Sequence, residues 1–338
     1  MKTNNSHAYI QELTKDITPA LRYDAQEDFD LWHTRARQKL TELLGLPLQR
    51  CEDEMAILRE TDCDGFRRID FEFQTEPGYF ASAALLIPDG TEAPRPTAIC
   101  LQGHSHGMHI SFGEVRYPGD EKTIAGGRDF AVRAVKEGFC AVTLEQRYMG
   151  LAGHTEDGSP ACLRNNEGMA TLLLGRTAIG ERVWDVQRLI DVIYKYFTAY
   201  VDTEKLVCLG NSGGGTATFY SACMEDRIRL AVPSCAVCTY EDSIMAMNHC
   251  PCNFIPGIRR WFDMGDLGGL IAPRKFILVC GKEDPIFPLP GVEKSYELIS
   301  GVYRHLGKEQ DCALVRGEGG HRFYPDEAWP VIHAMLGA

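Results

Sequence analysis

A serine flanked by glycines is the first candidate for chemistry in this sequence. It lies in Gly210-Asn-Ser-Gly-Gly214, after an apolar run typical of a buried strand and before a run typical of a helix. A G-x-S-x-G between strand and helix is the pattern of a nucleophile elbow, in which side chains at the glycine positions would collide with their neighbours. The turn would present the Ser212 hydroxyl at the carboxyl edge of a sheet, and the Gly213 amide at the helix N-terminus could bind a developing oxyanion. A phosphate-binding loop is the alternative, but no Lys-Ser or Lys-Thr follows the glycines.

A serine hydroxyl becomes a good nucleophile only when a base removes its proton and a carboxylate orients that base. In sheets of this kind the three residues follow the order serine, acid, histidine, each on a loop after a strand. Asp284 and His321 each come directly after a predicted strand and stand in that order. Glu283 is the nearest alternative acid, but one residue earlier its carboxylate would point to the other side of the loop. We therefore predict Ser212, Asp284 and His321 as a catalytic triad.

The second oxyanion donor is expected in the loop 102–109, which also follows a predicted strand. This loop reads Gln-Gly-His-Ser-His-Gly-Met-His, and the amide of His104 would face Ser212. His104, His106 and His109 also permit a metal-site interpretation, but an H-x-H pattern without an interleaved carboxylate is a weak zinc signature. We expect these side chains to contact substrate or backbone, and we predict no metal ion.

A second metal-like pattern is His249-Cys-Pro-Cys252. A structural zinc site needs four ligands, and no further cysteine or histidine pair follows at a typical spacing. A disulfide between Cys250 and Cys252 would close a small, strained ring. We expect a packed, turn-forming segment inside an irregular insertion at about 239–269, which would overhang the active site.

Candidate substrate contacts lie at the end of another predicted strand, in Glu145-Gln-Arg-Tyr148. Gln146 and Arg147 would reach the catalytic edge there, and His106 would reach it from the loop 102–109. Arg147 could bind a substrate hydroxyl or carboxylate. The alternative, which we favour slightly, is a salt bridge between Arg147 and an acidic neighbour.

The elements that position these residues alternate along the chain. An antiparallel hairpin is predicted first, with the Pro77-Gly78 turn between residues 69–73 and 80–87. Strands and helices then alternate, which implies parallel pairing with right-handed crossovers. The predicted strands are 97–101, 139–144, 206–210, 228–234, 275–281 and 312–316, and the predicted helices are 128–136, 181–199, 216–223, 291–306 and 325–336. The fold class is therefore α/β, with a mainly parallel sheet and helices on both faces.

An amphipathic helix is predicted over 24–47, with Asp24 as its N-cap and Gly45 and Pro47 ending it. No predicted strand precedes it, so we expect it to pack outside the main sheet as a lid or dimer arm. The predicted organisation is an N-terminal helical extension, residues 1–64, on one catalytic domain, residues 65–338.

Composition excludes several classes of partner. The chain has 338 residues, 35 basic and 47 acidic, for a net charge of −12, and no basic run. Nucleic acid and anionic membrane surfaces are therefore poor candidates as partners. The start of the chain has no apolar stretch like a signal peptide, and no run is long enough to span a bilayer. Thirteen scattered cysteines suit buried free thiols in a reducing compartment, so we expect a cytoplasmic protein, with homo-oligomerisation an open possibility.

Taken together, these motifs resemble the α/β-hydrolase superfamily, within it the acetylxylan-esterase-like and dienelactone-hydrolase-like branch. The resemblance covers roughly residues 65–338 and rests on residues 101–107, 145–150, 210–214, 281–285 and 320–321. It implies a mainly parallel eight-stranded sheet, no cofactor and acyl transfer through an acyl-Ser212 intermediate. Departures from the pattern are Gln102-Gly103 in place of the usual His-Gly, and Tyr148 in place of the glycine after Arg147.

The function expected from these observations is that of a serine carboxylesterase for short-chain esters of carbohydrate-like or other small alcohols. Dienelactone hydrolases proper use a cysteine nucleophile, so the serine favours ester hydrolysis over dienelactone opening. A prolyl-type peptidase or amidase and a lactone hydrolase are the enzymatic alternatives on the same triad, although the former class usually carries a propeller domain for which this chain has no room. A non-enzymatic binding protein is the remaining alternative, and it is disfavoured because all three triad candidates are present.

Overall fold

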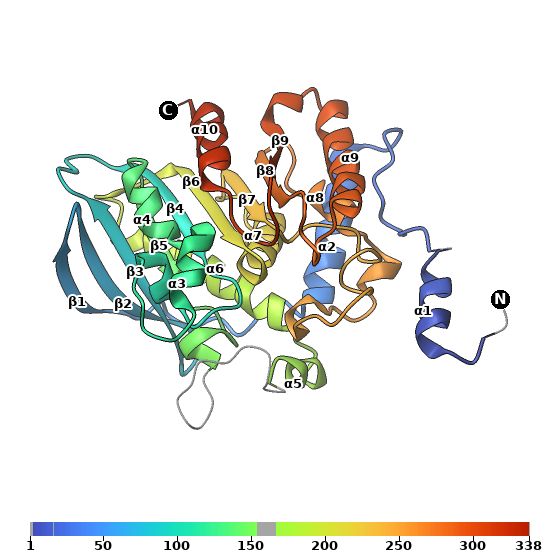
Figure 1. Ribbon diagram of the computed structural model, residues 1–338, viewed down its shortest axis with the longest axis horizontal. Coiled ribbons are helices and arrows are strands. Elements are labelled where there is room, and N and C mark those ends of the chain that lie inside the picture. The colour runs from blue at the N-terminus through green and yellow to red at the C-terminus, as the bar shows by residue number, and fades with distance from the viewer. Residues whose placement is uncertain (1–2, 16, 154–166, 338) are drawn as a thin grey trace.

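A nine-stranded sheet forms the centre of the protein, as a computed structural model shows for residues 3–15, 17–153 and 167–337 (Figure 1). In the order in which they lie side by side, the strands are β1 (Met55–Cys63), β2 (Phe66–Glu76), β3 (Tyr79–Pro88), β5 (Cys140–Leu144), β4 (Arg95–Leu101), β6 (Val201–Asn211), β7 (Leu230–Ser234), β8 (Lys275–Gly281) and β9 (Cys312–Gly317). β1, β2 and β3 pair antiparallel, as do β3 and β5, and all pairs from β5 to β9 are parallel. The carboxyl ends of β4, β6, β8 and β9 therefore meet at one edge, as the sequence predicts.

Helices cover both faces of the sheet and enclose two apolar cores (Figure 1). α2, α6, α7, α8 and α9 contribute to the larger core, and α4 and α10 contribute to the smaller one. The helices are α1 (Ser6–Lys15), α2 (Phe29–Leu44), α3 (Asp120–Thr123), α4 (Phe130–Lys136), α5 (Glu167–Leu173), α6 (Ala178–Tyr196), α7 (Gly213–Met224), α8 (Met264–Gly268), α9 (Leu289–His305) and α10 (Pro325–Leu336). The strands buried on both sides read as continuous apolar runs, which is why they were recognisable in the sequence.

The N-terminal helix α2 begins later than predicted. Its N-cap is Asp28, whose side chain accepts from the amide of Leu31, whereas Asp24 caps a separate turn at Gln26. Gly45 ends the helix in a left-handed conformation, as expected. One face of α2 is fully buried in the larger core, through Trp32, Ala36, Leu40 and Leu44. The helix is thus packed on the larger core.

Strand β1 corrects the predicted strand number and domain boundary. The sequence predicts eight strands and a boundary after residue 64, but β1 pairs with β2 along most of its length. A boundary there would divide one hairpin. Most β1 side chains are exposed, since it lies at the edge of the sheet, so it lacks the alternation of apolar residues that reveals a half-buried strand.

No disulfide joins any two cysteines within the described ranges. Ten of these twelve are buried, and they behave as small apolar side chains there. Within the same ranges, none of the helices has both the length and the hydropathy needed to cross a bilayer.

The buried face of α2 generates a stability prediction. Replacing Leu40, which is 0% exposed, by alanine leaves a cavity in the core and should lower the free energy of unfolding by about 2–5 kcal/mol. Leu31 on the same helix is 66% exposed, and Leu31→Ala should change the free energy of unfolding by no more than about 0.5 kcal/mol. Urea denaturation of both variants is the measurement. Equal, small losses would mean that α2 is not part of the folded core.

Candidate active site

The turn from β6 into α7 holds Ser212 in a strained backbone conformation. Its φ is 58° and its ψ is −127°, a region that non-glycine residues rarely occupy. The amide of Ser212 donates to the carbonyl of Ser234 on β7 at 2.9 Å, which fixes the turn to the next strand. A Cβ at Gly214 would overlap the carbonyl oxygen of Leu101, so glycine is required where α7 passes β4. This is the geometry of a nucleophile elbow.

Asp284 and His321 form a hydrogen-bonded pair beside this turn. Nδ1 of His321 lies 2.8 Å from Oδ2 of Asp284, and the other carboxylate oxygen accepts from the amides of Ile286 at 2.8 Å and Phe287 at 3.2 Å. Burial opposes ionisation of Asp284, but the hydrogen bond and charge of His321 and the two amides outweigh it, and the pKa of Asp284 lies below its usual value. The carboxylate is therefore held ionised, and hydrogen bonds to both of its oxygens fix its orientation.

The loops that carry the pair are fixed by neighbouring backbone and rings. β8 and β9 end together, with Gly281 opposite Gly317, so Asp284 and His321 leave the sheet at the same level. The hydroxyl of Tyr324 donates to the carbonyl of Gly320 at 2.7 Å and holds the glycine turn before His321. The ring of Phe287 stacks on the His321 imidazole, with ring centroids 6.0 Å apart.

Ser212 and His321 face one cavity of about 260 Å³. Its other lining residues are His104, Arg128, Gly213, Thr216, Asn248, His249, Cys250, Asn253, Ile286 and Phe287. No hydrogen bond joins the Ser212 hydroxyl to His321 in the described part of the chain, and such bonds are often long before substrate binds. The structure thus brings the three predicted triad residues to one place.

The predicted oxyanion residues also lie together. A Cβ at Gly103 would overlap the carbonyl oxygen of Asn211 and lie 3.0 Å from Cβ of Ser212, so only glycine lets the loop after β4 approach the elbow this closely. The imidazole of His104 packs against Gly213, whose ideal Cβ position is 3.0 Å from Cε1 of the ring.

Buried amide side chains hold this loop in place. The side-chain nitrogen of Gln102 donates to Ser111 Oγ at 2.8 Å and to the carbonyl of Arg128 at 2.6 Å. The side chain of Gln146 donates to the carbonyl of Gln102. Gln146 is 2% exposed and does not line the Ser212 cavity, so it supports the loop instead of contacting substrate as we expected.

Arg147 and His106 also lie away from the cavity. Arg147 is buried and pairs with Asp185 through Nε at 2.8 Å and with Glu76 through a terminal nitrogen at 2.7 Å, which is the salt-bridge alternative. Nδ1 of His106 lies 2.7 Å from Asp120, and Nε2 of His109 lies 2.8 Å from the other oxygen of the same carboxylate. These two histidines therefore turn away from His104, and Asp120 explains their spacing.

Arg128 is a cavity residue that the sequence did not reveal. We expected it at the start of a helix, but α4 begins at Phe130 and the Arg128 side chain turns into the Ser212 cavity. One terminal nitrogen donates weakly to the carbonyl of His104 at 3.4 Å. Burial lowers the pKa of Arg128, although an arginine stays charged. No local pattern marks such a residue, because its position depends on the loop path.

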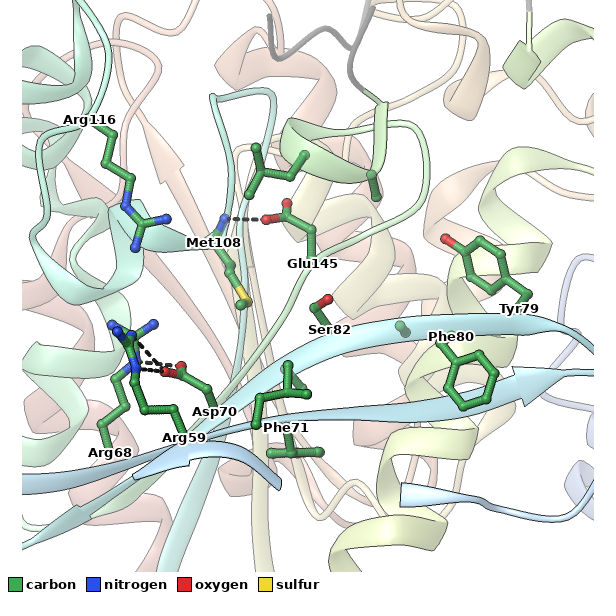
Figure 2. A pocket seen from close by; sticks show the side chains of 15 residues that line it. Arg59, Arg68, Asp70, Phe71, Tyr79, Phe80, Ser82, Met108, Arg116 and Glu145 are labelled. Atoms are coloured by element: carbon green, nitrogen blue, oxygen red, sulfur yellow. Dashed lines mark hydrogen bonds and ion pairs between the residues drawn. The ribbon is translucent and has the colours of Figure 1, made fainter. Parts of the chain in front are cut away.

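A larger cavity, of about 550 Å³, lies over β2 and β3 and includes none of the triad residues (Figure 2). Arg59 and Arg68 both pair with Asp70 at one side of it, and Glu145 faces it from the end of β5. One Glu145 oxygen accepts from the amide of Met108 at 3.0 Å, and the carboxylate packs against the loop that carries His104. Burial raises the pKa of Glu145 to about 7. Its lining contains neither the strained Ser212 nor the hydrogen-bonded pair of His321 and Asp284, so the smaller cavity is the candidate active site.

Comparisons with known proteins give a family match and a shared fold. The model of the Abhydrolase family matches residues 3–312. YtaP of Bacillus subtilis (strain 168), named as a candidate hydrolase, is 27% identical over 153 residues, which is 44% of this chain and 50% of that protein. The match thus spans about half the length of this curated relative.

Solved structures share the fold at low sequence identity. A candidate acetyl xylan esterase from Bacteroides fragilis NCTC 9343 superimposes with a TM-score of 0.75 and 18% identity, over 93% of this chain and 82% of the other. A glucuronoyl esterase from Solibacter usitatus gives a TM-score of 0.70 and 13% identity, over 96% of this chain and 100% of the other. The chain therefore has the α/β-hydrolase fold, and at such identities the likeness extends to the fold alone.

The raised pKa of Glu145 leads to a prediction about stability against pH. The folded protein holds this proton more tightly than the unfolded chain, so the stabilisation is complete below about pH 4.5 and is lost as pH rises through about 7. Glu145→Gln keeps the acceptor for Met108 without the charge. From pH 5 to 8, wild type should therefore lose about 2.5 kcal/mol more of its free energy of unfolding than the variant, at about 1.4 kcal/mol per pKa unit.

Urea denaturation at pH 5, 6, 7 and 8 measures this difference. The exposed Glu121→Gln serves as the control and should follow the wild-type profile. Parallel profiles for wild type and Glu145→Gln would contradict a raised pKa at this site.

Proposed function

The chain belongs to the Abhydrolase family, and from that premise we propose that it is a serine carboxylesterase for short-chain esters, above all acetyl esters, of carbohydrate-like or other small alcohols. The observation that carries the proposal is the strained Ser212 facing the same cavity as His321, which a buried carboxylate anchors. That arrangement provides a nucleophile, a base and an orienting acid.

The proposed reaction is a two-step acyl transfer. Ser212 Oγ attacks the ester carbonyl carbon while Nε2 of His321 takes its proton, and Asp284 stabilises the imidazolium through Nδ1. The tetrahedral intermediate collapses when His321 returns the proton to the leaving alcohol, which leaves an acyl group on Ser212. A water molecule, activated by His321, then releases the acid and restores the serine. No step requires a cofactor.

The oxyanion is proposed to bind between the amides of Gly213 and His104. Gly213 is the first residue of α7, where backbone amides lack helical partners and the helix dipole favours negative charge. Removing one such donor typically costs about 2.7–4 kcal/mol of transition-state stabilisation. The close packing of Gly103 on the elbow supports this role for the amide of the next residue, His104.

Substrate size and polarity are inferred from the cavity. Its volume of about 260 Å³ is small, and Ile286 and Phe287 supply an apolar wall suited to a short acyl group. Asn248, Asn253 and Arg128 supply hydrogen-bonding groups suited to a hydroxylated alcohol. The structural likeness to a candidate acetyl xylan esterase supports this choice.

Arg128 favours a second candidate, hydrolysis of esters of sugar acids. Its guanidinium lines the cavity and has no acidic partner among the described residues, so it could bind oxygen atoms on the acid side of the ester. The fold shared with a glucuronoyl esterase supports this candidate. Comparing methyl glucuronate with acetylated sugars as substrates separates the two.

The proposed function leads to a prediction about the nucleophile. Wild type should hydrolyse p-nitrophenyl acetate at least about tenfold faster than the decanoate, because the extra methylenes do not fit the cavity. Ser212→Ala should lower kcat by about 10⁴–10⁶-fold, and a fluorophosphonate probe should label wild type only. Retained turnover in Ser212→Ala would contradict the proposal.

A further prediction distinguishes the two adjacent acids, Glu283 and Asp284. Asp284→Asn keeps the shape of the side chain but favours the wrong imidazole tautomer, so kcat should fall by about 10³–10⁴-fold. Glu283 is exposed, and Glu283→Gln should leave kcat within about twofold of wild type. Initial rates on p-nitrophenyl acetate test both variants. A large loss in Glu283→Gln with little loss in Asp284→Asn would reassign the acid.

A further inference from the structure

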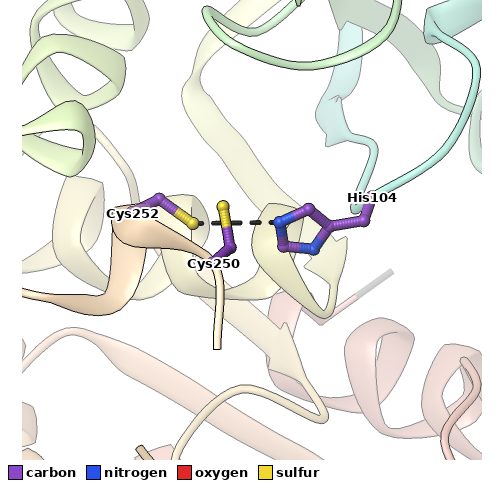
Figure 3. A group of neighbouring side chains, drawn as sticks. All are labelled: His104, Cys250 and Cys252. Atoms are coloured by element: carbon purple, nitrogen blue, oxygen red, sulfur yellow. Dashed lines mark hydrogen bonds between the residues drawn. The ribbon is translucent and has the colours of Figure 1, made fainter. Parts of the chain in front are cut away.

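Two cysteines and a histidine from distant parts of the chain meet at the wall of the Ser212 cavity. His104 comes from the loop after β4, and Cys250 and Cys252 come from the segment between β7 and β8 (Figure 3). Their ligand atoms all lie within 4.8 Å of one another, and Sγ of Cys252 is 4.0 Å from Nε2 of His104. His104 and Cys250 also line the cavity that contains Ser212.

The local backbone turns both sulfur atoms to the same side. Cys250 is extended, with φ −61° and ψ 143°, and Pro251 then begins the one-turn 3-10 helix η4 (Pro251–Asn253). Figure 3 shows both sulfur atoms on the side that faces His104. We expected a packed turn here, and η4 is one. The spacing of Cys250 and Cys252 did not predict His104 as a neighbour, because His104 lies on another loop.

This donor set matches the preferences of zinc. Zn–S bonds of about 2.3 Å and Zn–N bonds of about 2.0–2.1 Å place sulfur and nitrogen about 3.6 Å apart around a tetrahedral ion. The 4.0 Å between Cys252 and His104 is a few tenths of an ångström wider, which small side-chain rotations would close. Three protein ligands with a fourth position open are the usual arrangement of a zinc ion that can bind water or substrate.

A buried arginine provides an independent observation. Arg182 on α6 is 1% exposed, and its Nε donates to the carbonyl of Arg147 at 2.8 Å. Neither terminal nitrogen has a hydrogen-bond partner among the residues that the structure describes. Arg182 lies beside Cys250 and Cys252, around a gap too small to hold a water molecule. A guanidinium is always charged, so a buried one needs negative charge nearby, and thiolates beside it would supply that charge.

We propose that His104, Cys250 and Cys252 bind one thiophilic divalent cation of the zinc class, with both cysteines as thiolates and Arg182 beside them. Binding releases one proton from each thiol. The ion would tie the loop after β4 to η4 at the wall of the Ser212 cavity. This inference does not depend on ester hydrolysis.

Metal binding to the full-length protein tests the proposal directly. Reduced, chelator-treated protein is titrated with Zn²⁺ against a chromophoric chelator, and one ion should bind per chain. Substituted Co²⁺ should give visible bands of a tetrahedral site and sulfur-to-metal charge-transfer bands. Absence of a one-to-one site, or a Co²⁺ spectrum without sulfur bands, would overturn the proposal without any variant.

Variants then identify the ligands. Cys252→Ser and His104→Gln should each weaken Zn²⁺ binding by at least about 100-fold, because each loses a direct ligand. His249→Gln is the matched control, since its Nε2 lies 3.3 Å from the hydroxyl of Ser243 and outside the cluster. Ser212→Ala should bind Zn²⁺ like wild type, so a failed metal site and a failed esterase are distinguishable. Circular dichroism verifies that each variant is folded.

Two further outcomes would overturn the assignment. Undiminished Zn²⁺ binding in the double variant Cys250→Ala/Cys252→Ala would place the ion elsewhere. A disulfide between Cys250 and Cys252, detected by peptide mass in protein isolated without reductant, would make the pair a redox element instead of a metal site.

Discussion

The tight turn between β6 and α7 is the constraint on which the rest of the site depends. Holding a non-glycine residue in the conformation of Ser212 costs of order 1–3 kcal/mol, so the surrounding structure must enforce it. Strand β7 does so through the hydrogen bond from Ser212 to Ser234, and the first turn of α7 does so through the bond from the Thr216 amide to the Ser212 carbonyl at 2.8 Å. The strain is therefore supported by the neighbouring strand β7 and by the helix that follows.

Charged groups enter this apolar sheet only where other polar groups surround them. Asp284 is buried, but two amides and an imidazole bind its oxygens. Arg147, beneath the catalytic edge, is held by Asp185 and Glu76 and connects β2, the end of β5 and α6. Since an unpaired buried charge is costly, such pairs constrain where the elements can lie. Arg182 departs from this pattern, because its terminal nitrogens have no hydrogen-bond partner among the described residues. It lies beside Cys250 and Cys252, the two thiols of the proposed cation site.

The sequence predicted those parts of the structure that depend on local pattern. The bounds of β8 and α10 agree residue for residue, because apolar runs and helical spacing mark them. The triad prediction rested on residues that come directly after predicted strands, and recognising them requires no knowledge of distant contacts. Exposed β1 left no pattern, and the choice between Asp24 and Asp28 as N-cap depended on how α2 packs. Arg128 and the meeting of His104 with Cys252 depend on loop paths, which local spacing does not specify.

The loop after β4 shows why so many buried polar side chains gather near Ser212. A loop has no regular ladder of backbone hydrogen bonds, yet its buried polar groups still need partners. Here side chains supply them: Gln146 binds the Gln102 carbonyl, Glu145 binds the Met108 amide, and Asp120 binds the ring nitrogens of His106 and His109.

These contacts fix the loop before any substrate arrives. Electrostatic stabilisation of a transition state is most effective when its donors need no reorganisation during the reaction. Gln146 and His106, which we expected to contact substrate, therefore bear on the site in another way, because they help to hold the loop that carries His104. The sequence predicted this loop as the source of the second oxyanion donor, and the structure assigns Gln102, His106 and His109 to holding the loop in shape.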